Sequence, residues 1–558
     1  MNQRSLNICA RSLVAALLNL VLVFQFFAQA PAVAVENRSA LESAEAELAE
    51  KITVQSIKDM TAALAAPEME GRGTGQPGGD RAASWIAEKF RSFGMKPLGE
   101  KGSFLQKVEF KESIVARDSS FTAGDQTLVH GNEFAFVPQN NGNKNVSGDM
   151  VFVSYGIQAK KQNIDMLEGV NLSGKVVVMI EGPPPGMTDK SWSDIKAHMA
   201  IMRSLITAGA AAIVFLTRDD AKQTADESIS YLSRRQLTLP NEEGYPPQVP
   251  PFIYVGSKGA EKLFAKVGMT GAQALEKGGN PEFKPIDLKQ KAKIVAKFES
   301  KKVAASNVAG YLEGSDAKLK AEAVVFSAHF DAYGKENGKI YYGAADNALG
   351  TAEMLAVAEA FSKASQKPKR SLVFVAVTGE EYGLYGSKHW AKNPTWDVKK
   401  VAANLNLDGI GSEVYGPVKT MVGYGAEHST LGAMLDEVTK SYGVTVIPDP
   451  MPDEKVFYRS DHYSFVERGI PALMLLGAPA GEKEAWIKRI KDWEKTDYHQ
   501  PGDTIQPNWA WEGPETVAEV MAILGWRISE NPTMPGWLPS SKLSKFERGN
   551  TKEIPEDQ

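Results

Sequence analysis

The chain has 558 residues, 43% of them hydrophobic and 23% charged, which is ordinary for a folded globular protein with room for more than one domain. The formal net charge of −5 and the pI near 6.0 argue against a general nucleic-acid binder. The single cysteine, Cys9, lies near the N-terminus, so a metal site in the rest of the chain must use His, Asp and Glu ligands.

The first 34 residues have the layout of a secretory signal peptide. Arg4 and Arg11 precede an apolar run from Leu13 to Phe27, and small residues follow up to Ala34. We expect cleavage after Ala34, which predicts a secreted or periplasmic protein with no stable membrane insertion. The alternative is an uncleaved membrane anchor, for which the apolar run is short.

Residues 35–139 are expected to form the N-terminal part of the main domain. The Ala- and Glu-rich stretch from Ser39 to Leu64 predicts a helix. A glycine-rich turn at 69–75 then leads to a second helix, from Arg81 to Phe93, with apolar residues on one face. The turn has no phosphate-binding lysine pattern, so we expect a tight loop packed near a cleft.

Residues 140–295 have a different sequence pattern, in which short apolar runs typical of strands are separated by proline-rich loops. We expect strands at Asp149–Tyr155, Lys175–Ile180, Ala211–Leu216 and Pro251–Val255, and a helix at Lys196–Ala208. No group of ionisable residues with catalytic spacing stands out there. We interpret the segment as a small β-rich domain inserted into a larger one.

Strand and helix alternate from about Asn307 onward. We expect strands at Ala323–Ser327, Ser371–Val377, Val401–Leu407 and Pro471–Leu476, and helices at Asn347–Lys363, Tyr385–Lys392, Thr430–Tyr442 and Pro514–Ile528. This alternation predicts an α/β fold with a mostly parallel sheet flanked by helices on both faces. We assign residues 296–532 to this α/β domain and 533–558 to a peripheral tail.

Ionisable side chains gather where the strands of this sheet end. They are His329 and Asp331, Glu380 and Glu381, and Asp408, with Asp346 before a helix and His499 near the end of the α/β segment of the sequence. Ligands bind at the C-terminal ends of strands in open α/β sheets, so we expect these side chains to meet. Each of them alone could have a purely structural role, such as capping a helix for Asp346. Several carboxylates gathered in one cleft, however, need cations to neutralise them. Oxygen and imidazole ligands without thiolate suit Zn²⁺, with Mn²⁺ or Co²⁺ as substitutes.

The chain resembles metallopeptidase family 28, the co-catalytic dizinc aminopeptidases, which also include glutamate carboxypeptidase. The resemblance lies in HFD at 329–331, GAADN at 343–347, TGEEYGLYGS at 378–387, NLDGIG at 406–411, SDH at 460–462 and YHQPGDT at 498–504. The turn at 69–75 and the segment from about 140 to 290 also resemble family members that carry a protease-associated (PA) domain inserted in the peptidase domain.

The resemblance implies a pair of zinc ions and assigns their ligands. His329 and Asp408 would hold one ion, Glu381 and His499 the other, and Asp346 would bridge both. Mn²⁺ or Co²⁺ could substitute for zinc.

The resemblance also implies roles for residues that bind no metal. Glu380 would be the general base, Tyr498 would donate a hydrogen bond to the oxyanion, and Asp331 would orient the imidazole of His329. Asp461 and His462 would lie behind the ligands or in the substrate pocket. His462 competes with His499 as the last ligand, and we favour His499 because its motif fits the family's final ligand.

The implied activity is that of a zinc-dependent exopeptidase that removes N-terminal residues from peptides with a free N-terminus. Three alternatives remain open. A carboxypeptidase of the glutamate carboxypeptidase type would need pocket arginines, for which Arg72 and Arg459 are candidates. Glutaminyl cyclase, an acyltransferase on a related fold, uses one zinc, and a non-catalytic binding protein, as the transferrin receptor is, would have lost its metals. The complete ligand set argues against the last two. Side-chain specificity and oligomeric state stay open.

Overall fold

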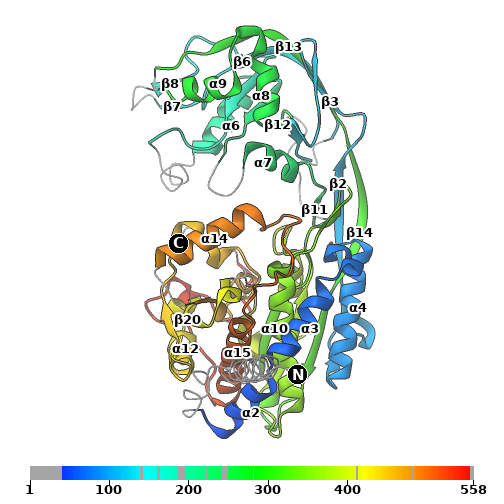
Figure 1. Ribbon diagram of the computed structural model, residues 1–558, viewed down its shortest axis with the longest axis vertical. Helices are drawn as coiled ribbons and strands as arrows, with labels where there is room; N and C mark the ends of the chain where they lie inside the picture. Colours follow the sequence, from blue (N-terminus) through cyan, green and yellow to red (C-terminus); the bar gives the residue numbers. More distant parts are fainter. Residues whose placement is uncertain are drawn as a thin grey trace, which may run out of the picture.

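The computed structural model describes residues 41–552 except 139–141, 160–163, 187–196, 220–223, 241–248, 281, 410–411 and 480–482. The expected signal peptide, residues 1–34, therefore lies outside the described residues. The described chain builds two large sheets, each covered by helices, which lie one above the other in Figure 1. No helix within these described ranges combines the length and apolar character needed to cross a membrane.

The larger sheet has ten strands in the order β11-β2-β14-β18-β15-β19-β22-β20-β21, with β1 paired to β14. Its centre is parallel and consists of β18 (Ser371–Val377), β15 (Ala323–His329), β19 (Val401–Asn406) and β22 (Ala472–Pro479). One flank holds β14 (Phe298–Leu312), β2 (Leu105–Val115), β11 (Gln236–Thr238) and β1 (Lys96–Pro97), and the other holds β20 (Val418–Tyr424) and β21 (Thr445–Ile447). Each residue of β15 and β18 is buried, which explains why both strands are apolar throughout.

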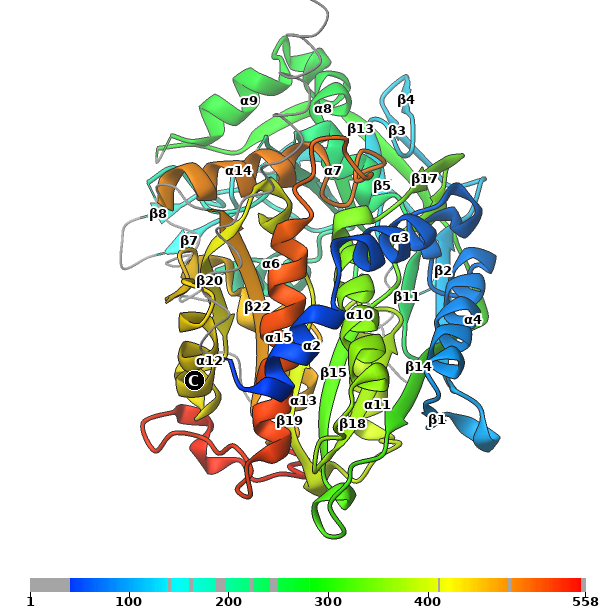
Figure 2. The same cartoon turned by 60° about the horizontal axis from the view of Figure 1, so that its bottom comes forward.

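Helices cover both faces of this sheet. One face carries α2 (Ser43–Lys51), α3 (Val54–Leu64), α4 (Pro77–Ser92), α10 (Gly350–Lys363), α12 (Leu431–Lys440) and α15 (Glu512–Glu530), of which α2, α10 and α15 cross the front of Figure 2. The other face carries α11 (Tyr385–Lys392), α13 (His462–Val466) and α14 (Lys483–Thr496). The predicted α/β fold class is confirmed.

The second sheet has eight strands in the order β4-β3-β13-β6-β9-β10-β12-β5. The strands are β3 (Ser120–Ala123), β4 (Gln126–Leu128), β5 (Phe134–Phe136), β6 (Lys144–Phe152), β9 (Val176–Ile180), β10 (Ala212–Leu216), β12 (Phe252–Val255) and β13 (Ile286–Ala296). Helix α6 (Ala197–Thr207) packs on one side, and α8 (Ser257–Phe264) and α9 (Gly271–Gly278) on the other. This β-rich unit has its own core, and we call residues 120–296, except strand β11 of the larger sheet, the inserted domain; the boundaries expected at 140 and 295 stay predictions.

Two connections join the inserted domain to the larger sheet. The first is a ribbon in which only Lys297 separates β13 from β14, while β2 pairs along β14 and leads into β3. The second is the segment from α7 (Ala225–Leu232) to β11, because α7 packs beside β5 and β12 of the inserted domain whereas β11 pairs with β2 of the larger sheet. Figure 1 shows this segment descending between the two units.

Three local expectations differ from the structure. The helix expected from Ser39 to Leu64 is two helices, because Thr53 is extended and caps α3 by accepting a hydrogen bond from the Ser56 N–H. The helix expected from Asn347 begins at Gly350, after an irregular turn over 344–349. Strand β14 was not expected, since its first half is exposed and charged rather than apolar.

Candidate metal centre

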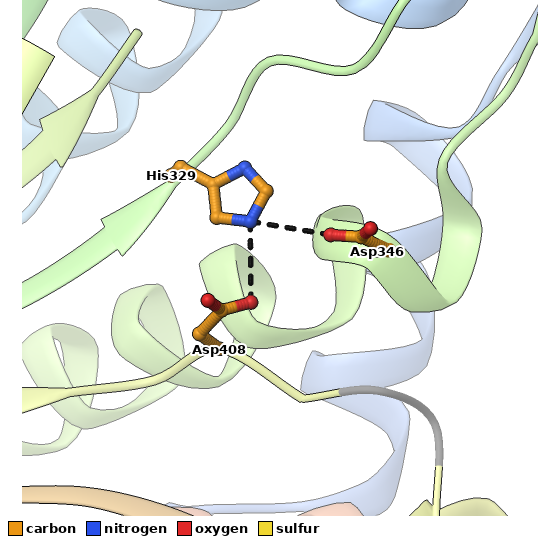
Figure 3. A group of neighbouring side chains, drawn as sticks. All are labelled: His329, Asp346 and Asp408. Carbon is orange, nitrogen blue, oxygen red and sulfur yellow. Dashed lines mark hydrogen bonds and ion pairs between the residues drawn. The ribbon is translucent and has the colours of Figure 1, made fainter. Parts of the chain in front are cut away.

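Two groups of side chains that can each hold a metal ion lie at the C-terminal ends of the central strands. In the first group, His329 Nε2 lies 3.2 Å from Asp346 Oδ1 and 3.1 Å from Asp408 Oδ1 (Figure 3). In the second group, His499 Nε2 lies 3.3 Å from Asp346 Oδ2 and 3.0 Å from Glu381 Oε2. Asp346 belongs to both groups and offers one carboxylate oxygen to each.

The fold explains why these residues meet. His329 is the last residue of β15, Asp408 follows β19, and Glu381 follows β18, and these parallel neighbours all end at the same edge. Asp346 lies in the irregular turn before α10, where the Asp346–Asn347 peptide is cis. The structure brings these candidate ligands together at this edge, and their roles as ligands stay predictions.

The electrostatics of the two groups suit a divalent cation. Burial lowers the pKa of His329 and of His499, but the carboxylates facing them outweigh burial and hold both pKa values well above the usual range. Burial opposes ionisation of Asp346, yet hydrogen bonds from both imidazoles hold the pKa of its carboxyl well below the usual range. Nε2 of each imidazole thus lies 3.0–3.3 Å from two carboxylate oxygens, and a divalent cation bound among these atoms would offset the charge of the carboxylates. Nitrogen and oxygen donors in this arrangement fit Zn²⁺.

One orphaned atom supports the same fit. Glu381 Oε2 has no hydrogen-bond partner among the described residues, although it lies 3.0 Å from His499 Nε2. A buried carboxylate oxygen without a donor is costly unless an ion occupies the space in front of it.

Asp331 supports the first group through its backbone as well as its side chain. Its carbonyl oxygen lies 3.2 Å from His329 Nδ1, whereas its carboxylate lies 3.8 Å away. The carboxylate instead accepts hydrogen bonds from Thr74 Oγ1 at 2.9 Å and from the Glu380 N–H at 3.2 Å. The side chain of Asp331 therefore ties the glycine-rich turn to the loop that carries Glu380, and the main-chain oxygen is the nearer partner of the imidazole.

Asp503 fixes the shared ligand, and sequence reasoning gave it no role. Its carboxylate accepts the Ala345 N–H at 2.8 Å and the Asp346 N–H at 3.0 Å. Burial, opposed by these two hydrogen bonds, raises the pKa of Asp503 to about 7. The available signal was its place in the same short motif as His499.

Arg72, a candidate for binding a substrate carboxylate, has a different role. Its side chain is fully buried and donates hydrogen bonds to the backbone carbonyls of Leu64, Phe330, Tyr342 and Gly343. Phe330, Tyr342 and Gly343 lie in the loops next to His329 and Asp346, and Leu64 ends helix α3. Arg72 therefore holds the backbone around the site in place and does not face a substrate.

A cavity opens beside the first group. Its lining combines His329, Asp346 and Asp408 with Glu380, Tyr498, Arg459, Glu454, Glu494 and Ser460, and with the apolar side chains of Met451, Val456, Met474 and Trp493. The ring of Tyr498 stacks on that of His499 with centroids 3.6 Å apart. Burial raises the pKa of Glu380 well above its usual range, and the nearby carboxylates of Asp408 and Asp461 raise it further against the effect of His329.

His462 and Asp461 lie behind this cavity in α13 and its cap. His462 is fully buried, its ring packs on Phe457 with centroids 5.3 Å apart, and burial lowers its pKa to about 4. It belongs to neither group of described ligand candidates. Asp461 is also fully buried, which raises its pKa to about 7. The neighbouring Ser460 hydroxyl donates to Asp408 Oδ2 and so orients that ligand.

Two further residues near the second group come from the inserted domain, where no functional residue was expected. The Tyr231 ring stacks on that of His499, and Arg234 donates a hydrogen bond to the His499 carbonyl. The sequence around them carries no motif. Their position beside His499 becomes visible only in the structure, where the chain runs from α7 in the inserted domain to β11 in the larger sheet.

Comparison with known families and curated proteins finds similarity to part of the larger domain. Residues 307–524 match the model of Peptidase family M28. The Vacuolar membrane protease of Candida dubliniensis is 26% identical over 182 residues, which are 33% of this chain and 17% of that protein. The Glutamate carboxypeptidase 2 homolog of Caenorhabditis elegans is 25% identical over 367 residues, which are 57% of this chain and 43% of that protein. The chain thus spans less than half the length of these curated relatives.

Solved structures share the fold over most of the chain. An aminopeptidase from Aneurinibacillus sp. strain AM-1 has a TM-score of 0.57 at 18% identity and covers 88% of this chain and 97% of its own. BSAP, a zinc aminopeptidase from Bacillus subtilis, has a TM-score of 0.54 at 16% identity and covers 89% and 98%. At these identities the similarity establishes the fold.

Proposed function

Because residues 307–524 belong to peptidase family M28 and contain both candidate metal groups, we propose that this metallopeptidase is a two-zinc aminopeptidase. The observation that carries the proposal is that Asp346 is shared between the two groups while Glu380 lines the adjoining cavity. Its substrates would be peptides with a free N-terminus. The apolar N-terminal segment supports a secreted or periplasmic location.

Each residue of the site has a part in peptide hydrolysis. His329 and Asp408 would hold one zinc, Glu381 and His499 the other, and Asp346 both. Bound zinc would polarise the scissile carbonyl and activate a water molecule at neutral pH.

Proton transfer is the task of Glu380. Its backbone is fixed by the hydrogen bond to Asp331, and its side chain faces the cavity. From there it accepts a proton from the attacking water and returns it to the leaving amine. The Tyr498 hydroxyl, in the same cavity, donates a hydrogen bond to the developing oxyanion.

The charges of the cavity favour an aminopeptidase over a carboxypeptidase. Of the two arginines considered for a carboxylate pocket, Arg72 is committed to backbone carbonyls and only Arg459 lines the cavity. Glu454 and Glu494 line it as well. Such a lining attracts the ammonium group of a free N-terminus more than the carboxylates of an acidic dipeptide.

The test uses one peptide in three forms: free, N-terminally acetylated and C-terminally amidated. Products are identified by mass spectrometry with and without a zinc chelator. The proposal predicts chelator-sensitive release of N-terminal residues that acetylation abolishes and amidation leaves intact. Release blocked by amidation alone would establish a carboxypeptidase instead, and no cleavage of any form by protein holding two metals would favour a binding role.

A further inference from the structure

His499 is held in place by residues of the inserted domain as well as by its own loop. Its backbone φ is 57°, a left-handed conformation that costs a residue other than glycine about 1–3 kcal/mol. Its side chain is 20% exposed, whereas that of His329 is 1% exposed. The contacts around His499 therefore decide whether its imidazole stays in position to bind a metal.

The imidazole ring is enclosed by tyrosines. Tyr333 meets it edge-on with centroids 4.8 Å apart, and Tyr231 of the inserted domain lies nearly parallel to it, at 6.1 Å and 7°. The Tyr333 hydroxyl lies 3.4 Å from His499 Nδ1, 3.1 Å from the Tyr231 hydroxyl and 3.3 Å from the Glu381 carbonyl. When Nε2 binds a metal, Nδ1 carries the proton and needs an acceptor, and such partners set ring orientation and metal affinity. Here that acceptor is the Tyr333 hydroxyl, which is itself hydrogen-bonded to the Tyr231 hydroxyl.

Arg234 holds the backbone of the same residue. Its Nη2 donates to the His499 carbonyl at 2.8 Å, and its guanidinium lies 4.9, 4.6 and 4.1 Å from the ring centroids of Tyr231, Tyr333 and Tyr341. The residue is 3% exposed, yet Nε and Nη1 have no hydrogen-bond partner among the described residues. An unpaired buried donor costs about 1–3 kcal/mol. The cation–π contacts offset part of this cost, and the remaining hydrogen bond is directed at His499.

Arg235 fastens this segment to the larger domain. It forms ion pairs with Glu112 at 3.0 Å and with Glu336 at 2.9 Å, and all three side chains are largely buried. The next residues pair with β2 as strand β11. Tyr231 and Arg234 therefore have a fixed position against the metal centre.

The first metal group has a different support. His329 Nδ1 faces the carbonyl of Asp331, and Ser460 orients Asp408, so both partners belong to the larger domain. Only the second group shows contacts to the inserted domain among these described interactions.

We propose that Tyr231 and Arg234 are positioning residues for the second metal group, so that the affinity of Asp346, Glu381 and His499 for a divalent ion depends on the inserted domain. The inference rests on the proposed function in that both require two metal ions. It extends that function by giving the inserted domain a part in assembling the site.

The test is a Co²⁺ titration of the metal-free full-length protein, followed by visible absorption and by metal analysis after dialysis. The main variant is Arg234→Met, which keeps an unbranched apolar side chain and removes the charge and the hydrogen-bond donors. The matched control is Arg218→Met, since Arg218 also lies over a tyrosine of the inserted domain, Tyr155, at 5.7 Å, and contacts neither metal group. Tyr231→Leu is a second, independent variant, and thermal unfolding of the metal-free proteins reports on folding.

Wild type and Arg218→Met should bind two Co²⁺ ions with the same pair of dissociation constants. Arg234→Met and Tyr231→Leu should keep one of the two constants at its wild-type value and weaken the other by about 10-fold or more, as loss of a partner that orients a ligand usually does. A general loss of structure would weaken both constants. Two wild-type constants in Arg234→Met and Tyr231→Leu, or equal weakening of both, would overturn the inference alone. Uptake of fewer than two ions by the wild type would overturn the proposed function.

Discussion

Asp503→Asn tests how strongly the backbone around the shared ligand controls metal binding. The two carboxylate oxygens of Asp503 accept the N–H groups of Ala345 and Asp346, at 2.8 and 3.0 Å. An asparagine can accept only one of them, and its amide then points a donor at the other N–H. Losing a charge-assisted hydrogen bond and leaving a buried donor unpaired costs about 2 kcal/mol, which is roughly a 30-fold change in an equilibrium constant.

Because Asp346 belongs to both metal groups, Asp503→Asn should lower the affinity for each metal by roughly 30-fold. The assay is equilibrium dialysis of the metal-free protein against buffered Zn²⁺, with metal content measured at each concentration. Asp497→Asn is the matched control, since Asp497 lies in the same loop but accepts from Thr496 rather than from the turn of Asp346. Unchanged affinity of both metals in Asp503→Asn would refute the reasoning, as would an equal loss in the control.

Three further outcomes are expected. Glu380→Gln should keep both metals and lower kcat by roughly 10²-fold or more, because the variant cannot accept a proton; metal analysis and peptide turnover check this, and normal turnover would remove Glu380 as the base. Asp346→Ala should lose both metals, and two zinc ions at full occupancy would contradict a shared ligand. Burial, together with nearby Glu413, raises the pKa of Glu353 well above the usual glutamate value of 4.5. The folded state therefore holds the proton more tightly and loses stability as pH rises above that value, by up to about 1.4 kcal/mol per pH unit. Glu353→Gln should remove this loss, so the Tm of the variant minus that of the wild type should increase from pH 5 to pH 7. A Tm difference independent of pH would argue against a neutral Glu353.

The parts of the site that could be predicted from sequence are those that depend on short-range order. A buried parallel strand is a continuous apolar run, so the ends of β15, β18 and β19 are visible in the sequence, and with them His329, Glu381 and Asp408. The strand β14 was missed for the same physical reason: its exposed half in the connecting ribbon reads as a charged loop. An apolar run in the sequence therefore reveals a strand only where that strand is buried along its length.

The supporting residues could not be predicted, because their roles exist only through tertiary contacts. Thr74 lies 257 positions from Asp331 in the chain, yet it donates to the carboxylate of that residue. Arg72 reads as a surface or substrate-binding arginine until its four carbonyl acceptors are known. Asp331 was expected to orient the imidazole of His329, but the sequence did not say by which atom, and in the fold its carbonyl oxygen lies nearer to Nδ1 than its carboxylate does.

The contrast between the two imidazoles explains why an inserted domain can matter to a metal centre. His329 ends a central strand, so the sheet itself fixes its backbone and Asp331 needs only to orient the ring. His499 lies in a loop with a left-handed backbone, and no strand of the sheet holds it. A ligand on such a loop needs partners from outside, and the segment from α7 to β11 brings Tyr231 and Arg234 to it. Because α7 also packs on β5 and β12 of the inserted domain, a displacement of that domain would reach His499 through Tyr231 and Arg234, whereas His329 has its described partners within the larger domain.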